Sequence, residues 1–106
     1  MLSPADIQHA ADRIVKHANS PLRVVVFGSY GRGDATDDSD LDLLVVEKSL
    51  ADFTNEYVAL RKAIGPIGVG VDLLLLSDED YQLRKHWISS PVYWAFREGK
   101  VVYGAA

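Results

Sequence analysis

The chain has 106 residues, of which 48% are hydrophobic, and its eleven Lys and Arg against fifteen Asp and Glu give a formal net charge of −4. This length suits one domain with its own core, and the negative charge disfavours extended, sequence-independent nucleic-acid binding, because such binding depends on neutralising many phosphates. The sequence contains no cysteine, which excludes disulfides, thiolate metal sites and a thiol nucleophile.

The N-terminal residues do not have the pattern of a signal peptide. They lack a basic segment followed by an apolar core, and no apolar run of the chain is long enough to cross a bilayer. We therefore expect a cytoplasmic protein that makes no contact with a membrane and folds as a single domain over residues 1–106.

The first predicted elements are a helix and a strand. Ser3 is placed to cap a helix, Pro4 suits its first position, and Asp6 is favourable near its N-terminus. Apolar residues at helical spacing predict that this helix continues to near Asn19. The β-branched run Leu22–Phe27 does not alternate with polar residues, which predicts a strand covered on both faces.

Two further strands are predicted, with a helix between them. Residues 28–39 are rich in turn residues and predict turns with a short helix, and Leu41–Val46 is the second apolar strand. The following helix stops at Gly65 and has a predicted buried stripe of four residues: Phe53, Tyr57, Leu60 and Ile64. The third strand, Gly68–Leu76, is apolar except for Asp72 in its middle.

The C-terminal segment predicts two helices and a short closing strand. Ser77 is the cap signal of a helix that reaches about Trp87. Ser90 and Pro91 open a second helix that Gly99 ends, and residues 100–103 form the strand. We expect the aromatic side chains of this segment to lie mostly in the core: Tyr81, Trp87, Tyr93, Trp94, Phe96 and Tyr103. The whole pattern predicts an α/β (α+β) fold, with a small mixed sheet of three to five strands and helices mainly on one face.

Asp40 and Asp42 open the second strand two positions apart. Because successive side chains of a strand alternate between its two faces, both carboxylates point the same way. The same alternation lets Asp72 join them if the second and third strands are neighbours. The sequence therefore predicts three carboxylates at one place on the sheet.

Three carboxylates in one place need a compensating charge. Two of them about 4 Å apart repel by roughly 4 kcal/mol at an effective dielectric constant near 20, and Arg32 is the one cation between Arg23 and Lys48. Either one Asp is protonated with a raised pKa, or divalent cations such as Mg²⁺ bind there. We favour the cations, because close carboxylates on a rigid sheet suit two-metal catalysis on a phosphate ester or anhydride.

Gly28 and Ser29 stand where the first strand ends. A glycine allows a ligand to approach closely, and the following N–H groups and the Ser29 hydroxyl can hold phosphate oxygens. Arg32 is placed either to neutralise further phosphate charge or to pair with the acidic loop that follows it. We therefore expect Gly28, Ser29 and Arg32 to hold the phosphate groups of the substrate.

Three better-known motifs are excluded by single residues. Asp34 occupies the position of the lysine in a P-loop, and Thr36 replaces the third glycine of a dinucleotide-binding fingerprint. A calcium loop would need glycine at Leu43 and a bidentate glutamate at Ser49.

The spacing of these residues resembles that of a known superfamily. Gly28-Ser29, ten intervening residues, Asp40-x-Asp42 and the later Asp72 resemble the signature of the polymerase-β-like nucleotidyltransferases. Within that superfamily the short chain is similar to the minimal nucleotidyltransferases that are paired with HEPN-domain toxins. The resemblance implies that Asp40, Asp42 and Asp72 are the metal-binding triad, for which we expect two Mg²⁺ ions, and that Gly28 and Ser29 hold the triphosphate of ATP. It further implies an antitoxin that transfers AMP to a tyrosine of its HEPN partner and thereby blocks the RNase activity of that partner.

Two other activities remain open. A small-molecule transferase, such as one that modifies an aminoglycoside, would use the same residues with an acceptor pocket formed in an oligomer. A non-catalytic antitoxin would mask its toxin by binding alone. The motifs leave the acceptor side of the site without a wall, so we expect the acceptor, or a partner that carries it, to complete the site in a homo- or hetero-oligomer.

Overall fold

The computed structural model describes residues 1–105 and contains every helix and strand that the sequence predicts. In chain order they are α1 (Pro4–His17), β1 (Pro21–Phe27), α2 (Gly28–Arg32), β2 (Leu41–Glu47), α3 (Phe53–Ile64), β3 (Val71–Ser77), α4 (Asp78–Arg84), α5 (Pro91–Glu98) and β4 (Lys100–Gly104). β3 begins later than predicted because Gly68 has a φ of 89°, which belongs to a turn rather than a strand. α4 ends at Arg84, before the predicted end at Trp87.

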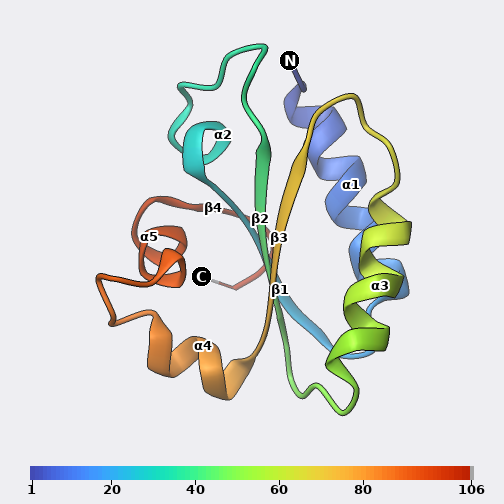
Figure 1. The fold of residues 1–106 in the computed structure, drawn as a ribbon, viewed down its shortest axis with the longest axis vertical. Coiled ribbons are helices and arrows are strands. Elements are labelled where there is room, and N and C mark those ends of the chain that lie inside the picture. The colour runs from blue at the N-terminus through green and yellow to red at the C-terminus, as the bar shows by residue number, and fades with distance from the viewer. Residues whose placement is uncertain (106) are drawn as a thin grey trace.

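The four strands form one mixed sheet with the order β3-β2-β1-β4. β1 is antiparallel to both β2 and β4, whereas β2 and β3 are parallel and are joined through α3. Figure 1 shows the strongly twisted sheet running through the middle of the molecule. The predicted α/β fold with a mixed sheet is confirmed, and β2 is held between two neighbours along its whole length.

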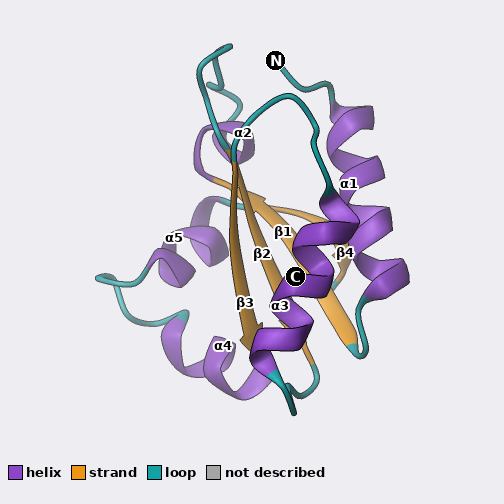
Figure 2. Cartoon of the chain, turned by 45° about the vertical axis from the view of Figure 1, so that its right-hand side comes forward, coloured by secondary structure: helices purple, strands orange, loops and turns teal. Residues whose placement is uncertain are grey.

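Helices cover both faces of the sheet, with α1 and α3 on one face and α4 and α5 on the other (Figures 1 and 2). The prediction that the helices lie mainly on one face is therefore wrong. The reason is visible along β2, where alternate side chains enter two separate cores. Leu43 and Val45 pack in the core beneath α1 and α3, whereas Leu44 and Val46 pack in the core beneath α4 and α5. A strand that is apolar on both faces needs a helical layer on each of them.

The start of α1 is fixed by local hydrogen bonds, of which the sequence predicts the cap by Ser3. The Asp6 N–H donates to Ser3 Oγ at 3.1 Å, and the Ser3 N–H donates to Asp6 Oδ2 at 2.9 Å. This reciprocal capping box satisfies two donors that the first turn of the helix cannot pair internally. The apolar stripe of α1 then faces the sheet through Ala11 and Ile14, both fully buried.

Some side chains predicted to be buried are exposed. Phe53 is 50% exposed because it is the first residue of α3, and it stacks on Tyr57 with 5.8 Å between the ring centroids. Among the C-terminal aromatic residues Tyr81 is buried, but four others are exposed: Trp87, Trp94, Phe96 and Tyr103. α4 and α5 have only seven and eight residues, so each covers the sheet with a narrow face and leaves its remaining side chains outside.

Within residues 1–105, none of the helices combines the length and the apolar character that a membrane-spanning helix requires.

Candidate active site

Asp42 and Asp72 face each other across two parallel strands. β2 and β3 pair with Asp42 opposite Asp72 and Leu41 opposite Val71, and the Leu41 N–H donates to the carbonyl of Gly70 at 2.9 Å. Asp72 is exposed and Asp42 is partly buried. The structure thus brings together two of the carboxylates that the sequence singles out, at the end of the sheet where β2 and β3 begin.

Asp40 lies immediately before β2 and is exposed to solvent. It stands two residues before Asp42, so strand alternation places both on one side of the chain. Its negative charge acts on Asp42 and helps to raise the pKa of that carboxyl group. Asp40 is therefore near the Asp42–Asp72 pair, although it does not belong to a strand itself.

Gly28 begins α2 directly beside Asp42. The last residue of β1, Phe27, pairs with Asp42 in the antiparallel ladder, and the chain then turns into α2 at Gly28 with a φ of 65°. A Cβ atom at Gly28 would overlap Oδ2 of Asp42. Both the backbone conformation and the space beside the carboxylate therefore require glycine at this position.

Ser29 occupies the first turn of the short helix α2, next to the Asp pair. Its carbonyl accepts the N–H groups of Gly33 and Asp34, both at 3.0 Å, which closes this single turn. Among residues 1–105, no side chain caps the N-terminus of α2, where Phe27 is the N-cap residue. The N–H groups at the start of the turn are thus available to oxygens of a ligand.

The carboxyl group of Asp42 has a raised pKa of about 6. Burial is the largest cause, followed by a hydrogen bond to Asp72 and by the negative charges of Asp72 and Asp40, while the Arg32 guanidinium acts in the opposite direction. Below a pH of about 6 a proton on Asp42 relieves the repulsion between the carboxylates, which is the first of the two ways that the sequence suggests. A site that gains a proton to relieve its own charge also attracts a cation.

Arg32 pairs with acidic side chains on either side of it. Its Nε lies 3.2 Å from Oδ2 of Asp34, in the acidic loop, and its Nη1 lies 3.7 Å from Oε2 of Glu98 at the end of α5. Arg32 is 46% exposed and lowers the pKa of Asp42 through its charge. The guanidinium is therefore near the Asp pair and accessible, and its pairing with the acidic loop is one of the two predicted alternatives.

The chemistry of the carboxylates fits Mg²⁺. The cluster offers oxygen ligands alone, which is the ligand type that Mg²⁺ prefers. The repulsion between the carboxylates that raises the pKa of Asp42 would also be relieved by a bound cation. With the side chains as they lie, no three carboxylate or imidazole groups among residues 1–105 surround a common point closely enough to enclose an ion. Asp40, Asp42 and Asp72 are the residues that would hold the metal.

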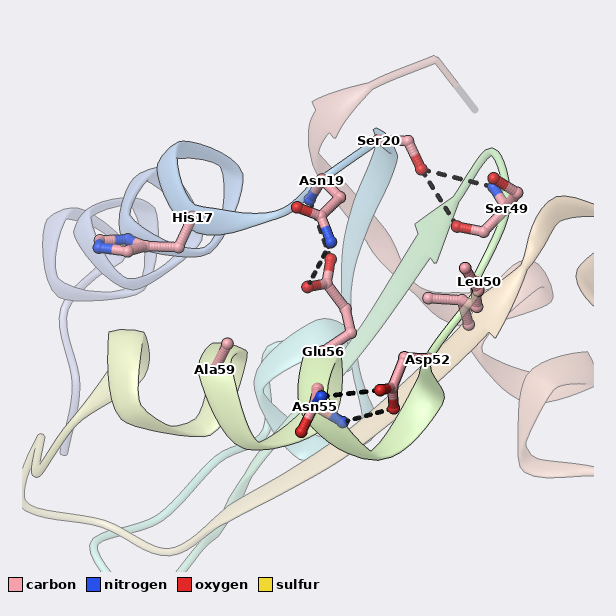
Figure 3. A pocket seen from close by; sticks show the side chains of 10 residues that line it. His17, Asn19, Ser20, Ser49, Leu50, Asp52, Asn55, Glu56 and Ala59 are labelled. Carbon is pink, nitrogen blue, oxygen red and sulfur yellow. Dashed lines mark hydrogen bonds between the residues drawn. The ribbon is translucent and has the colours of Figure 1, made fainter.

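A large cavity lies elsewhere, beyond the opposite end of β2. It has a volume of about 660 Å³ and is lined by side chains from the end of α1, the loop after β2 and the first turns of α3, as Figure 3 shows. Glu56 lies in it and accepts two hydrogen bonds from Asn19, at 2.9 Å from the N–H and 3.1 Å from Nδ2. None of the predicted site residues lines this cavity.

Glu47, at the end of β2 near this cavity, is a residue whose environment the sequence does not reveal. It is fully buried, and its Oε1 accepts the Ser20 N–H at 2.9 Å, while no N–H or hydroxyl donor among the described residues reaches Oε2. Its pKa is raised to about 7, first by burial and then by a hydrogen bond to Glu56. We interpret the two glutamates as a structural pair that shares one proton, so that Oε2 of Glu47 carries it.

The mixed sheet, with a Gly-Ser turn beside a facing pair of aspartates, defines a class of phosphate-transferring proteins. Comparison with known proteins identifies the family within this class. The model of the family described as "Nucleotidyltransferase domain" matches residues 10–92. The chain belongs to this family and is a nucleotidyltransferase.

The chain is also similar to individual proteins. It is 32% identical over 88 residues to a protein of Methanocaldococcus jannaschii named "Putative protein adenylyltransferase MJ0604", covering 83% of this chain and 84% of the relative. Among solved structures, a chain of a toxin–antitoxin complex with AMP-PNP has a TM-score of 0.68 at 20% identity, covering 98% of this chain and 75% of the other. A mutant of the toxin–antitoxin MntA-HpeT gives a TM-score of 0.65 at 17% identity, with 98% and 75% covered. These matches support a minimal nucleotidyltransferase, as the motif resemblance implies.

Proposed function

We propose that this nucleotidyltransferase transfers AMP from ATP to a hydroxyl group of a partner protein, with Mg²⁺ bound at Asp40, Asp42 and Asp72. The observation that carries the proposal is the direct opposition of Asp42 and Asp72 beside the turn at Gly28. The two carboxylates repel each other when both are ionised, so they can bind a metal ion. They lie where a strand ends in a glycine turn, which can hold the triphosphate that the metal binds.

Each residue has a defined part in the proposed reaction. Gly28 leaves room for the Asp42 carboxylate beside its backbone, while the Ser29 hydroxyl and the first N–H groups of α2 donate to the triphosphate oxygens. Arg32 neutralises further phosphate charge after exchanging one of its carboxylate partners for a phosphate oxygen. When bound, Mg²⁺ supplies positive charge and Lewis acidity at the phosphate oxygens.

The transfer itself forms one bond to phosphorus and breaks another. The acceptor hydroxyl gives its proton to the Asp72 carboxylate, its oxygen bonds to the α-phosphorus of ATP, and the bond from that phosphorus to the bridging oxygen breaks so that pyrophosphate leaves. Asp72 suits the part of the base because it is exposed at the edge of the sheet, where an acceptor can reach it. Asp40 and Asp42 supply negative charge that would hold the bound Mg²⁺ in place.

The proposed acceptor is a tyrosine of a HEPN-domain RNase toxin, and the protein then acts as its antitoxin. This choice follows the motif resemblance and is supported by the name of the relative, "Putative protein adenylyltransferase MJ0604", and by the toxin–antitoxin complexes among the similar folds. The geometry agrees with a protein acceptor, because Asp40 and Asp72 are exposed to solvent at the end of the sheet where β2 and β3 begin.

The proposal is tested by intact-mass measurement of the product of the neighbouring gene after incubation with ATP, Mg²⁺ and this protein. We expect a gain of one or more AMP units, abolished by Asp42→Asn and retained by Asp38→Asn, which removes an exposed carboxylate of the preceding loop. A stable complex without any gain in mass would instead indicate masking by binding. Transfer to an aminoglycoside in the absence of the neighbouring protein would indicate a small-molecule transferase.

A further inference from the structure

Gly70 stands opposite Asp40, two positions before the pair formed by Asp42 and Asp72. The parallel ladder begins with Leu41 opposite Val71, and the Leu41 N–H donates to the Gly70 carbonyl at 2.9 Å. Strand alternation therefore places Gly70 and Asp72 on the same side of β3, as it places Asp40 and Asp42 on the same side of β2. A side chain at residue 70 would point toward Asp40.

The space that such a side chain would fill is taken by the Asp40 carboxylate. A Cβ atom at Gly70 would lie 2.5 Å from Oδ1, 3.0 Å from Cγ and 3.5 Å from Oδ2 of Asp40. The first of these distances is well inside van der Waals contact, so the carboxylate and a Cβ atom cannot occupy these positions together. Asp40 is thus laid against the bare backbone of Gly70, as Asp42 is laid against that of Gly28.

The backbone of Gly70 gives no other reason for glycine. Gly28 and Gly68 have positive φ angles of 65° and 89°, whereas Gly70 is not among the glycines with positive φ. Alanine could therefore adopt the conformation of residue 70 without strain. What requires glycine there is the side chain of Asp40.

We propose that Gly70 is a positioning residue, which keeps open the space that holds the Asp40 carboxylate beside the Asp42–Asp72 pair. The inference rests on the proposed function in one respect, namely that Asp40 is a metal ligand. A Cβ atom at residue 70 turns the Asp40 carboxylate out toward solvent, which the exposed side chain does at little cost to the fold. The metal site then lacks one carboxylate although all three aspartates are present.

The test compares two glycine variants of the same loop by calorimetric titration with the Mn²⁺ complex of AMP-PNP and by thermal melting without metal. Gly70→Ala is expected to bind the complex about 10–100-fold more weakly, the range found when a metal ligand loses its supporting contact, with an unchanged melting temperature. Gly68→Ala is expected to show the reverse, because residue 68 has a positive φ but open space around its Cβ position. Gly68→Ala is expected to melt at a lower temperature than the unaltered protein and to bind the Mn²⁺ complex equally well.

A double-variant cycle separates a role through Asp40 from a general one. Asp40→Asn weakens binding by itself, and adding Gly70→Ala to it is expected to produce no further loss, because the group that Gly70 positions is already gone. The assignment would be overturned if Gly70→Ala weakened binding equally in the unaltered protein and in Asp40→Asn. It would also be overturned if Gly70→Ala left binding unchanged, or if its melting temperature fell like that of Gly68→Ala. If the unaltered protein does not bind the Mn²⁺ complex at all, the proposed function itself fails.

Discussion

Asp42 on β2 and Asp72 on β3 stand directly opposite each other in a parallel pair, and protonated Asp42 donates a hydrogen bond to Asp72. A proton and a divalent cation relieve the same repulsion at this place, so each lowers the affinity of the site for the other. This competition makes the electrostatics of the site measurable through stability, pH and cation binding.

Replacing Asp42 by Asn is expected to stabilise the metal-free protein at neutral pH. The pKa of Asp42 rises from an ordinary 3.8 to about 6 on folding, so the folded state holds a proton that the unfolded state releases. The stability that this proton on Asp42 contributes is fully present below pH 4 and is lost as the pH rises through 6. Asn imitates the protonated form at every pH. Because the group is partly exposed, the gain at pH 7.5 is about 0.5–1 kcal/mol.

Thermal melts in the presence of a chelator measure this gain. The difference between Asp42→Asn and the unaltered protein is expected to vanish at pH 4 and to be constant above pH 7. Addition of Mg²⁺ and nucleotide raises the melting temperature of the unaltered protein but not that of the variant, because the variant has lost a ligand. A variant clearly less stable than the unaltered protein at pH 7.5 without metal would show that Asp42 is structural.

The buried pair of Glu47 and Glu56 is expected to produce a second, separate loss of stability with rising pH. The pKa of Glu47 increases from an ordinary 4.5 to about 7, chiefly through burial and then through its hydrogen bond to Glu56. The folded state therefore binds more protons than the unfolded state between these values, and the free energy of unfolding falls across the interval. The loss is on the order of 2 kcal/mol.

Glu47→Gln tests this pair, because a glutamine amide can donate to Glu56 in place of the shared proton. Its free energy of unfolding, measured with urea from pH 4.5 to 8, is expected to be nearly flat where that of the unaltered protein declines. Glu79→Gln removes an exposed carboxylate of α4 and serves as the matched control. Nucleotide transfer is expected to persist in Glu47→Gln, since Glu47 lies at the far end of β2. A steep decline retained in Glu47→Gln would contradict the shared proton.

The local part of the fold can be predicted from the sequence, because the relevant interactions join residues close in the chain. The cap of α1 by Ser3 is one such case, and the break between Phe27 and the turn at Gly28 is another. Strand alternation also predicts that Asp42 and Asp72 meet if their strands are neighbours, and the parallel register fulfils that condition.

The remaining features depend on contacts between distant segments. Glu47 follows an apolar run, as a solvated strand end does, but Ser20 and Glu56 close over it in the folded chain. The reason for glycine at residue 70 is equally invisible in the sequence, because Asp40 is thirty residues away. Phe53 fits the helical stripe of α3, yet it lies beyond the part of the helix that the sheet covers.

Substitution of Gly28 by Ala is expected to damage both the fold and the site. The positive φ alone costs about 1–2 kcal/mol for a residue with a Cβ atom, and that atom would overlap Oδ2 of Asp42. Gly33→Ala provides the comparison, since residue 33 has a φ of 86° but no atom within 4 Å of its Cβ position. Melting and calorimetry with Mn²⁺ and AMP-PNP measure the two effects. Gly33→Ala is expected to lose stability but to keep its cation binding. Equal cation binding by Gly28→Ala and Gly33→Ala would argue against contact between Gly28 and Asp42.

Replacing Arg32 by Ala is expected to weaken nucleotide binding with little change in stability. Its ion pairs with Asp34 and Glu98 are exposed, and such pairs contribute about 0–1 kcal/mol each. A charged hydrogen bond to phosphate is worth about 1.5–3 kcal/mol, so the KM for ATP rises about tenfold or more. Steady-state kinetics and thermal melts test this, with Arg84→Ala on α4 as the control. A fall in the melting temperature without any change in KM would mean that Arg32 only pairs with acidic side chains. An unchanged melting temperature with a raised KM would assign the guanidinium to the triphosphate.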